Sequence, residues 1–303
     1  MSKTIIRISG GLGNQMFQYS LGRALSLRNG SEFVMDLSFY SDQKPGDPVR
    51  HYTLDKLSVV ERFATKEDFR DIGLPYPLSK SPLSRLRKKF ITFAEPKKPI
   101  KDRKFITEPN FAFIREILDI KHDAYFSGVW QSDKYFRSAE KVVRNDFKLK
   151  QPYSKTAAEV NREISSCESV AIHVRRGDQV SNPHLLKKHG ALTDEYYQNA
   201  VRYIRAHTKN ARFFIFSDEP EWVKANLDIG ADAYIVSGRD IPDYEELMLM
   251  SSCKHQVVAK SSYSWWGGWL NENPNKIVIT PKHRFGSETA NDGDLIPETW
   301  IRL

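Results

Sequence analysis

The sequence has little cysteine and no long apolar run, and both absences exclude whole classes of protein. Only two cysteines, Cys167 and Cys253, occur among 303 residues, too few for the disulfide framework of a small secreted domain. No apolar run approaches the roughly 20 residues needed to cross a bilayer. Residues 1–3 lead directly into an apolar stretch, leaving no room for a signal peptide. These features predict a cytoplasmic protein.

The composition is that of a globular protein whose charge is unevenly distributed. Hydrophobic residues make up 40% and charged residues 28%, and a chain of this length is sufficient for two domains. Residues 80–104 hold ten Lys and Arg against two acids, a difference that equals the whole net charge of +8. This segment is either a solvated loop or a surface that attracts the protein to anionic lipid or a lipid-linked diphosphate acceptor. No nucleic-acid-binding signature accompanies it, so nucleic acid is not an expected partner.

One stretch joins an apolar strand to a cluster of polar side chains. Residues 170–174 are mainly apolar and β-branched, which predicts a buried strand. Arg175, Arg176 and Asp178 follow at once, where a strand of an α/β sheet presents its carboxyl end to ligands. A guanidinium pairs with phosphate oxygens through two parallel hydrogen bonds, so the arginines indicate a diphosphate site. His173 is either a core residue or a nucleotide contact.

A glycine-rich turn lies near the N-terminus. Residues 4–9 predict a strand and residues 14–27 a helix, with the turn between them. Met16 stands where a dinucleotide fingerprint has its third glycine, and no Gly-Lys-Ser/Thr is present, so neither a dinucleotide site nor a P-loop is predicted. Amides are suited to sugar hydroxyls, so Asn14, Gln15 and Gln18 beside Gly11 indicate a sugar-binding cluster.

The second half of the chain alternates strands with helices, which predicts a parallel sheet covered on both faces. Polar residues follow two further strands: Ser217 and Asp218 after one, and Ser261, Ser262 and Ser264 after another. The carboxyl ends of parallel strands share one edge of the sheet, so these side chains are expected in one crevice with the arginines. Each of them taken singly is also typical of a helix cap.

These motifs, in their order and spacing, resemble glycosyltransferase family 11, the galactoside α1,2-fucosyltransferases. The segments that carry the resemblance are residues 10–19, 173–178, 216–222, 243–253 and 261–270. The resemblance implies an α/β fold of the GT-B type, with two Rossmann-like domains facing a cleft. Residues 1–155, joined by the tail 286–303, would form the acceptor-side domain. Residues 156–285 would form the domain that binds GDP-fucose.

The resemblance also implies an activity, the transfer of L-fucose from GDP-β-L-fucose to the 2-hydroxyl of a terminal galactoside, with inversion. Negative charge then grows on the departing phosphate, and the two arginines would stabilise it. The expected catalytic residues are Arg175, Asp178 and Asn14. The expected donor-binding residues are His173, Arg175, Arg176, Ser217, Asp218, Asp243, Ser261, Ser262 and Tyr263, with Asp243 facing guanine and Ser262 the phosphates.

Several alternatives stay open at this stage. The base that deprotonates the acceptor is unassigned among Asp178, Asn14, Asp194 and Glu195. Residues 292–294 read Asp-Gly-Asp, a form that metal-dependent glycosyltransferases use, but they lie in a polar tail, and no metal cofactor is expected. A fucosyltransferase of another linkage, such as α1,6, and a non-catalytic glycan-binding protein are the alternative functions.

Overall fold

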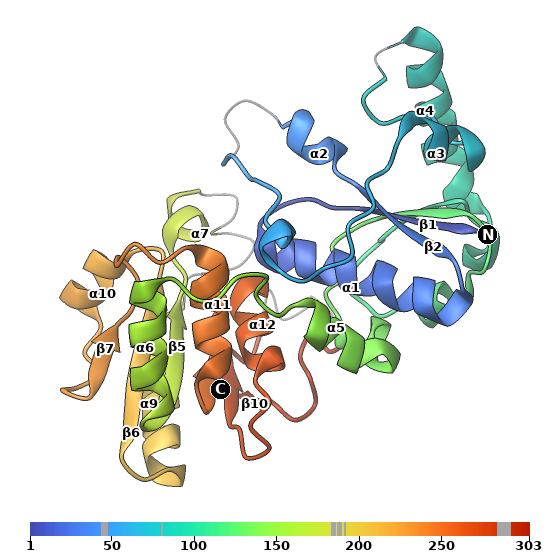
Figure 1. Cartoon of the computed structure of the whole chain (residues 1–303). Helices are drawn as coiled ribbons and strands as arrows, with labels where there is room; N and C mark the ends of the chain where they lie inside the picture. Colours follow the sequence, from blue (N-terminus) through green and yellow to red (C-terminus); the bar gives the residue numbers. More distant parts are fainter. Residues whose placement is uncertain (44–47, 80, 183–185, 187–189, 191, 284–291) are drawn as a thin grey trace. The chain divides into compact units, whose positions relative to one another are not determined.

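The computed structural model divides the chain into two compact units, Met1–Lys150 and Gln151–Leu303. It describes residues 1–43, 48–79, 81–182, 186, 190, 192–283 and 292–303 (Figure 1). Each unit combines helices with its own parallel sheet. The α/β class with two parallel-sheet domains, expected from the sequence, is therefore confirmed.

The first unit is built on a parallel sheet whose described strands have the order β2-β1-β4-β3. Its strands are β1 (Lys3–Arg7), β2 (Glu32–Asp36), β3 (Phe105–Thr107) and β4 (Ala124–Ser127). Its α-helices are α1 (Leu12–Asn29), α2 (Ser38–Ser41), α3 (Lys66–Asp71), α4 (Pro82–Ala94) and α5 (Glu140–Asp146). Short 3-10 helices lie at η1 (Leu54–Lys56), η2 (Glu95–Lys97), η3 (Ile100–Asp102), η4 (Arg115–Asp119), η5 (Asp133–Tyr135) and η6 (Arg137–Ala139).

Helix α1 packs directly on the first sheet because of one glycine. A Cβ at Gly22 would overlap the side chains of Ile6 on β1 and Phe33 on β2. Any larger residue would therefore push the helix off the sheet. The helix ends at Gly30, whose left-handed φ of 62° forms the C-cap that glycine favours.

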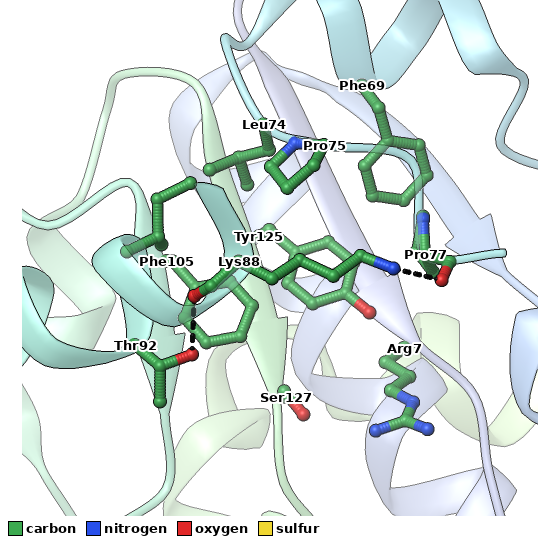
Figure 2. A pocket seen from close by; sticks show the side chains of 11 residues that line it. Arg7, Phe69, Leu74, Pro75, Pro77, Lys88, Thr92, Phe105, Tyr125 and Ser127 are labelled. Carbon is green, nitrogen blue, oxygen red and sulfur yellow. Dashed lines mark hydrogen bonds between the residues drawn. The ribbon is translucent and has the colours of Figure 1, made fainter. Parts of the chain in front are cut away.

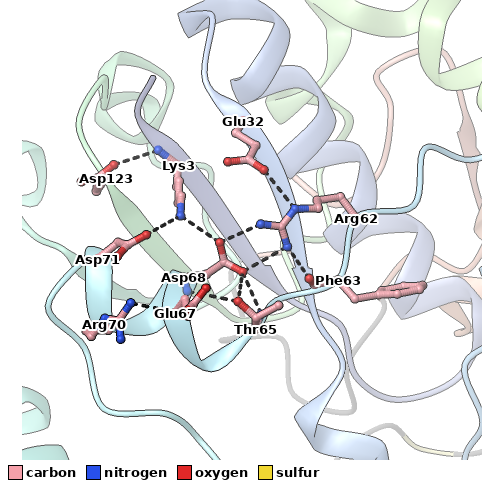
Figure 3. A network of polar contacts seen from close by, with 10 residues as sticks. All are labelled: Lys3, Glu32, Arg62, Phe63, Thr65, Glu67, Asp68, Arg70, Asp71 and Asp123. Atoms are coloured by element: carbon pink, nitrogen blue, oxygen red, sulfur yellow. Dashed lines mark hydrogen bonds and ion pairs between the residues drawn. The ribbon is translucent and has the colours of Figure 1, made fainter.

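A buried carboxylate, Asp68, ties helix α3 to the strands of the first unit (Figure 3). It accepts hydrogen bonds at 2.8 Å from Lys3 at the start of β1 and from Arg62, which also pairs with Glu32 on β2. It completes a capping box with Thr65 at the start of α3. Burial opposes ionisation, but the bonds from Arg62, Lys3 and Thr65 outweigh it and hold the pKa of Asp68 well below its usual range.

The second unit contains a six-stranded parallel sheet in the order β10-β9-β8-β5-β6-β7 within the described ranges. Its strands are β5 (Glu168–Val174), β6 (Ala211–Ser217), β7 (Ala233–Ile235), β8 (His255–Val257), β9 (Val278–Thr280) and β10 (Ile301–Arg302). Its helices are α6 (Lys155–Ser165), α7 (Gly177–Ser181), α9 (Asp194–His207), α10 (Pro220–Asn226), α11 (Asp243–Ser252) and α12 (Ser262–Leu270).

The central strand β5 is buried on both faces of this sheet, as its continuous apolar run predicts. Val170, Ile172 and Val174 pack in one core cluster with residues of α9 and α10. Side chains alternate along a strand, so Ala171 and His173 face the opposite side. There the His173 ring lies 5.6 Å from the ring of Tyr263 on α12, measured between centroids.

The C-terminal tail belongs to the second unit, which corrects the expectation that residues 286–303 join the first. Its described part, residues 292–303, adds β10 to β9 in parallel, and Trp300 packs against Trp265 of α12. Backbone pairing and aromatic packing therefore fix this part of the tail. The remaining residues of the predicted tail, 286–291, lie outside the described residues.

Two sequence features can be followed directly in the structure. Cys167 and Cys253 are both free thiols. No helix in the described ranges has the length and apolar character to span a bilayer.

Candidate functional site

The second sheet has a topological switch point between β5 and β8. From β5 the chain adds β6 and β7 on one side, then returns to add β8, β9 and β10 on the other. Ligands of doubly wound sheets bind outside the carboxyl ends of the strands where this reversal occurs. Arg175 follows β5 directly, and Ser261 follows β8 by four residues. The structure therefore brings the arginine and serine motifs to neighbouring strand ends, as predicted.

Arg175 and Arg176 are both engaged by the turn that follows β6. The Arg175 guanidinium lies 2.8 Å from Asp218 Oδ2, and the Arg176 backbone N–H donates to Asp218 Oδ1 at 3.0 Å. The Arg176 guanidinium pairs with Glu219 at 3.1 Å and lies 3.6 Å from the centroid of the Trp222 ring. The Arg175 side chain is 24% exposed and the Arg176 side chain is 20% exposed.

Asp218 contacts the arginine loop with both of its carboxylate oxygens. The carboxylate therefore holds Arg175 in place, and its expected contact with the donor stays a prediction. Glu219 and Trp222 lie in the motif of residues 216–222, but their contact with Arg176 depends on β5 and β6 pairing side by side.

Gly177 allows the arginine loop and the Asp218 turn to approach each other. A Cβ at this position would overlap Asp218 Oδ2, and the φ of Gly177 is +23°. A side chain would thus displace the carboxylate that holds Arg175. Asp178 lies in α7, but its side chain falls outside the described part of the chain, and its expected catalytic role stays a prediction.

The serine motif forms the N-terminus of α12 at the end of β8. Ser261 is the N-cap, and its hydroxyl accepts a hydrogen bond from the Tyr263 N–H at 3.2 Å. Ser262 opens the helix, while the buried Ser264 accepts from the Ala259 N–H. Ser217, in contrast, accepts from the Glu219 N–H in the turn after β6. A capped helix N-terminus beside a guanidinium is suited to an anionic oxygen.

His173 is buried beside this edge and stays neutral at physiological pH. Burial, assisted by the charge of Arg175, lowers the pKa of His173 to about 3. Its Nδ1 atom has no hydrogen-bond partner among the described residues. A buried polar atom without a partner requires an explanation, and a nucleotide contact would provide one. His173 is therefore a core residue that also lies beside the proposed site.

A second carboxylate cluster borders the site at the start of α11. Asp243 is exposed in the first helical turn, and its backbone carbonyl accepts a hydrogen bond from the Tyr263 hydroxyl. Glu246, one turn later, accepts from Ser237 at 3.0 Å. Burial, with a contribution from the Asp243 charge, raises the pKa of Glu246 to about 7. No local sequence signal marks Glu246 as buried, because acidic residues in helices are usually exposed.

The glycine-rich turn of the first unit places Asn14 at a strand end, but two of its neighbours are structural. Asn14 Oδ1 accepts from Gln131 at 2.8 Å, which links the segments after β1 and β4. Gln15 donates to the Gly10 and His51 carbonyls and accepts from the Thr53 N–H. Gln18 bonds to Ser9 and to the Gly128 carbonyl.

Both glutamines are completely buried. The expectation that Gln15 and Gln18 hold sugar hydroxyls is therefore corrected: their amides brace the loop from inside. Gly11 is the N-cap of α1, and Asn14 is the partly exposed amide of this cluster.

A cavity of about 230 Å³ lies at the carboxyl edge of the first sheet (Figure 2). Its walls come from the ends of β1 and β4 and from one side of α4. Phe105 and Tyr125 stack in its wall with their ring planes 5° apart, and Arg7 and Lys88 supply positive charge. The complete lining is Arg7, Phe69, Leu74, Pro75, Pro77, Lys88, Ile91, Thr92, Phe105, Tyr125 and Ser127. Aromatic surface beside charged donors is typical of a site for a ligand that has both polar and apolar parts, such as a sugar.

The remaining expected groups belong to the second unit, and α9 begins at the same carboxyl edge, because Tyr196 in its first turn donates a hydrogen bond to the Val258 carbonyl just after β8 at 2.6 Å. Asp194 and Glu195 are exposed in the first turn of α9. Asp292 is buried and lies 3.7 Å from Arg302 on β10. Among the described residues, no group of three or more His, Cys, Asp or Glu side chains is arranged to hold a metal ion.

Two parallel-sheet units, one with a cationic switch point and the other with an amide- and aromatic-lined edge, are suited to a glycosyltransferase. The comparisons bear out this class. The chain belongs to glycosyl transferase family 11, whose model matches residues 99–303. The resemblance drawn from the motifs is thereby confirmed.

Three curated relatives show the range of similarity. An α-1,2-colitosyltransferase of Escherichia coli is 33% identical over 307 residues, covering 100% of this chain and 99% of the relative. The O-antigen biosynthesis glycosyltransferase WbnK of Escherichia coli is 29% identical, covering 98% and 99%. The galactoside α-(1,2)-fucosyltransferase 1 of Saimiri boliviensis boliviensis is 24% identical, covering 48% of this chain and 42% of the relative.

Proposed function

We propose that this protein transfers L-fucose from GDP-β-L-fucose to the 2-hydroxyl of a terminal galactoside, with inversion at the anomeric carbon. The observation that carries the proposal is the placement of Arg175 and the α12 N-terminus at the switch point of a parallel sheet. Relatives named for α-1,2 transfer support the linkage. A fold of the GT-B type, with two parallel-sheet units, is part of the proposal.

Arg175 is the group that we assign to the departing phosphate. The bond from the sugar C1 to the β-phosphate oxygen breaks while the galactoside oxygen bonds to C1, so negative charge grows on GDP. A fixed guanidinium and a helix N-terminus both stabilise that charge. We assign Arg176 a different role from Arg175, because its stacking on Trp222 and its pairing with Glu219 suit it to hold the loop. Arg176 therefore has a smaller role in our proposal than the sequence suggested.

The remaining donor contacts follow from the same edge of the sheet. Ser261, Ser262 and Tyr263 present the first turn of α12 to the phosphates. Asp243, exposed at the start of α11, is suited to the guanine N1 and N2 hydrogens, because an ionised carboxylate only accepts hydrogen bonds. His173 would donate or accept through its buried ring.

The acceptor side of the proposal rests on Asn14 and on the cavity beside β1 and β4. An amide orients a hydroxyl but does not remove its proton, so Asn14 is assigned to positioning of the galactoside. The base is expected to be a carboxylate within hydrogen-bond reach of the 2-hydroxyl, and Asp178 is the candidate nearest to the arginines in the chain. Its replacement by Asn would lower kcat if it has this role.

We expect no metal requirement, because Arg175 and the α12 N-terminus already supply positive charge at the leaving group. Activity measured in EDTA tests this expectation. Loss of activity that is restored by Mn²⁺ or Mg²⁺ would contradict it and would direct attention to the Asp292-Gly293-Asp294 segment.

The decisive experiment incubates the full chain with GDP-fucose and a panel of β-galactosides, followed by NMR of the product. We expect an α1,2 linkage and no transfer to the matched 2-deoxygalactoside. An α1,6 product, or transfer to the 2-deoxy acceptor, would overturn the assignment of linkage. Stabilisation by galactosides but not by GDP, without transfer, would instead indicate a glycan-binding protein.

The identity of the donor sugar needs its own arm in this experiment. The relative that is 33% identical is named for colitose, which is L-fucose without its 3-hydroxyl. GDP-colitose is therefore the second candidate donor. The ratio of kcat/KM for the two donors, measured with one acceptor, distinguishes them.

A further inference from the structure

Helix α4 has an apolar face that its own unit does not cover. None of its 13 residues is buried. Leu83, Leu86, Phe90 and Phe93 are exposed by 77%, 66%, 68% and 66% of their surfaces. Their spacing of three and four residues places them along one side of the helix. Four large exposed hydrophobic side chains in one row are unusual on a surface that faces only water.

The opposite side of α4 is the one that packs on the first unit. Ile91 packs against the cluster of Phe69, Leu74 and Tyr125, and Lys88 donates to the Pro77 carbonyl (Figure 2). At 100° per residue, these two positions lie on the side of the helix away from the exposed row. The exposed row is therefore not needed to attach α4 to the sheet.

Basic side chains border the apolar row on both sides. On the helical wheel Arg85 and Lys89 lie along one flank and Arg87 along the other. Lys97, beyond the helix, has its ammonium 3.5 Å from the centroid of the Phe93 ring. The first turn of α4 has no acidic residue. The partner of this face therefore has to be apolar in its interior and negatively charged at its surface.

We infer that α4 binds the surface of an anionic lipid bilayer, with Leu83, Leu86, Phe90 and Phe93 inserted among the acyl chains. A helix of 13 residues is about 20 Å long, shorter than the roughly 30 Å hydrocarbon core, so it lies in the plane of the interface. Leu and Phe on one face and Lys and Arg beside them are the features of such interfacial helices. The inference does not depend on the proposed transfer reaction.

The helix that contacts the bilayer in this proposal also lines the cavity of the first unit. Lys88, Ile91 and Thr92 of α4 line the cavity, while the apolar row faces away from it. One short helix therefore connects the bilayer surface with the edge of the first sheet. One consequence, unlike the binding itself, rests on the proposed function: binding through α4 would hold that edge near acceptors carried on lipid.

Vesicle cosedimentation of the full chain tests the inference. We expect binding to phosphatidylglycerol vesicles, weak binding to phosphatidylcholine vesicles, and a decrease with salt. Replacement of all four apolar residues by Ser should weaken binding by at least about a hundredfold. The double variant Arg85→Glu/Lys89→Glu should weaken it by at least about twenty-five-fold, from about fivefold for each basic residue removed.

Matched variants in the first unit distinguish binding through α4 from non-specific hydrophobic or electrostatic binding. The apolar control replaces Leu27, Val49 and Val60, which are also exposed, by Ser. The charge control is Lys121→Glu/Lys141→Glu, and both controls should bind as wild type does. Hydrogen exchange of residues 82–94 should slow on phosphatidylglycerol vesicles, which reports directly on α4 even if a variant folds poorly.

Three results would overturn the inference. The first is wild-type protein that does not bind anionic vesicles. The second is equal binding by the four-serine variant, together with unchanged exchange in residues 82–94. The third is a dimer that the four-serine variant converts to a monomer while vesicle binding is absent, which would make this face a contact between copies of the chain.

Discussion

Replacement of Arg175 by Ala is the most direct test of the proposed chemistry. The side chain is partly exposed and pairs with Asp218 at 2.8 Å. Asp218 would keep its bond from the Arg176 N–H, so we expect the turn to survive and the free energy of unfolding to fall by only about 1 kcal/mol. The charge aimed at the leaving phosphate would be lost.

The expected kinetic effect is much larger than the effect on stability. Loss of one fixed donor that acts in the transition state costs about 10² to 10³ in kcat, or about 2.7 to 4 kcal/mol. Initial rates of GDP release at saturating GDP-fucose measure this directly. Arg175→Lys keeps the charge but loses the planar fork of two donors, so its rate should lie between wild type and Arg175→Ala.

Arg212→Ala is a matched control for the loss of an arginine–carboxylate pair. Arg212 pairs with Glu163 at 2.7 Å but lies at the amino end of β6, at the far end of the strand from the proposed site. Its kcat should equal that of wild type. Near-normal turnover of Arg175→Ala at saturating donor, or an equal loss in Arg212→Ala, would refute the assignment of Arg175 to the leaving group.

Three further substitutions test the supporting structure. Gly177→Ala should lower kcat by at least about tenfold because the new Cβ displaces Asp218, whereas Gly73→Ala, also at positive φ but facing open space, should leave the rate unchanged. Asp68→Asn should lower the free energy of unfolding in urea by about 3 kcal/mol at pH 7, and the difference should shrink below about pH 4, because a depressed folded pKa stabilises only while the carboxylate is ionised. The pH dependence at Glu246 has the opposite sign, because its folded pKa is raised to about 7 and the protonated form favours the fold. Glu246→Gln should therefore raise Tm by about 2–4 °C at pH 8 and change it little at pH 5. An equal Tm change at both pH values would contradict this.

Strands β5 and β6 were predictable because each is largely a continuous apolar run. Thr193, a residue type favoured at helix N-caps, is the N-cap of α9, which begins at Asp194. Burial on both faces of a parallel sheet requires such continuous runs, so the signal is local. The convergence of the arginine and serine motifs followed from the same pattern, because parallel strands place their carboxyl ends at one edge.

The central part of the first unit was not predictable in this way. Prolines interrupt the sequence between residues 39 and 148, a pattern typical of short helices and loops. This region nevertheless supplies β3, β4 and the 13-residue helix α4. Strand β4 has only four residues and is stabilised by pairing with β1, more than 100 residues away in sequence. Such pairing leaves no periodic pattern for a local analysis to detect.

The motifs in this sequence were sufficient to indicate the family, the parallel α/β class and the arginine–serine edge, because these depend on residue types within a few positions of one another. The roles of single side chains required the folded chain. Gln15 and Gln18 carry amides that suit a ligand, but hydrogen bonds with distant backbone groups already use those amides. A hydrogen-bonding side chain has no role until its neighbours in space are known, and those neighbours come from strands that pair across the chain.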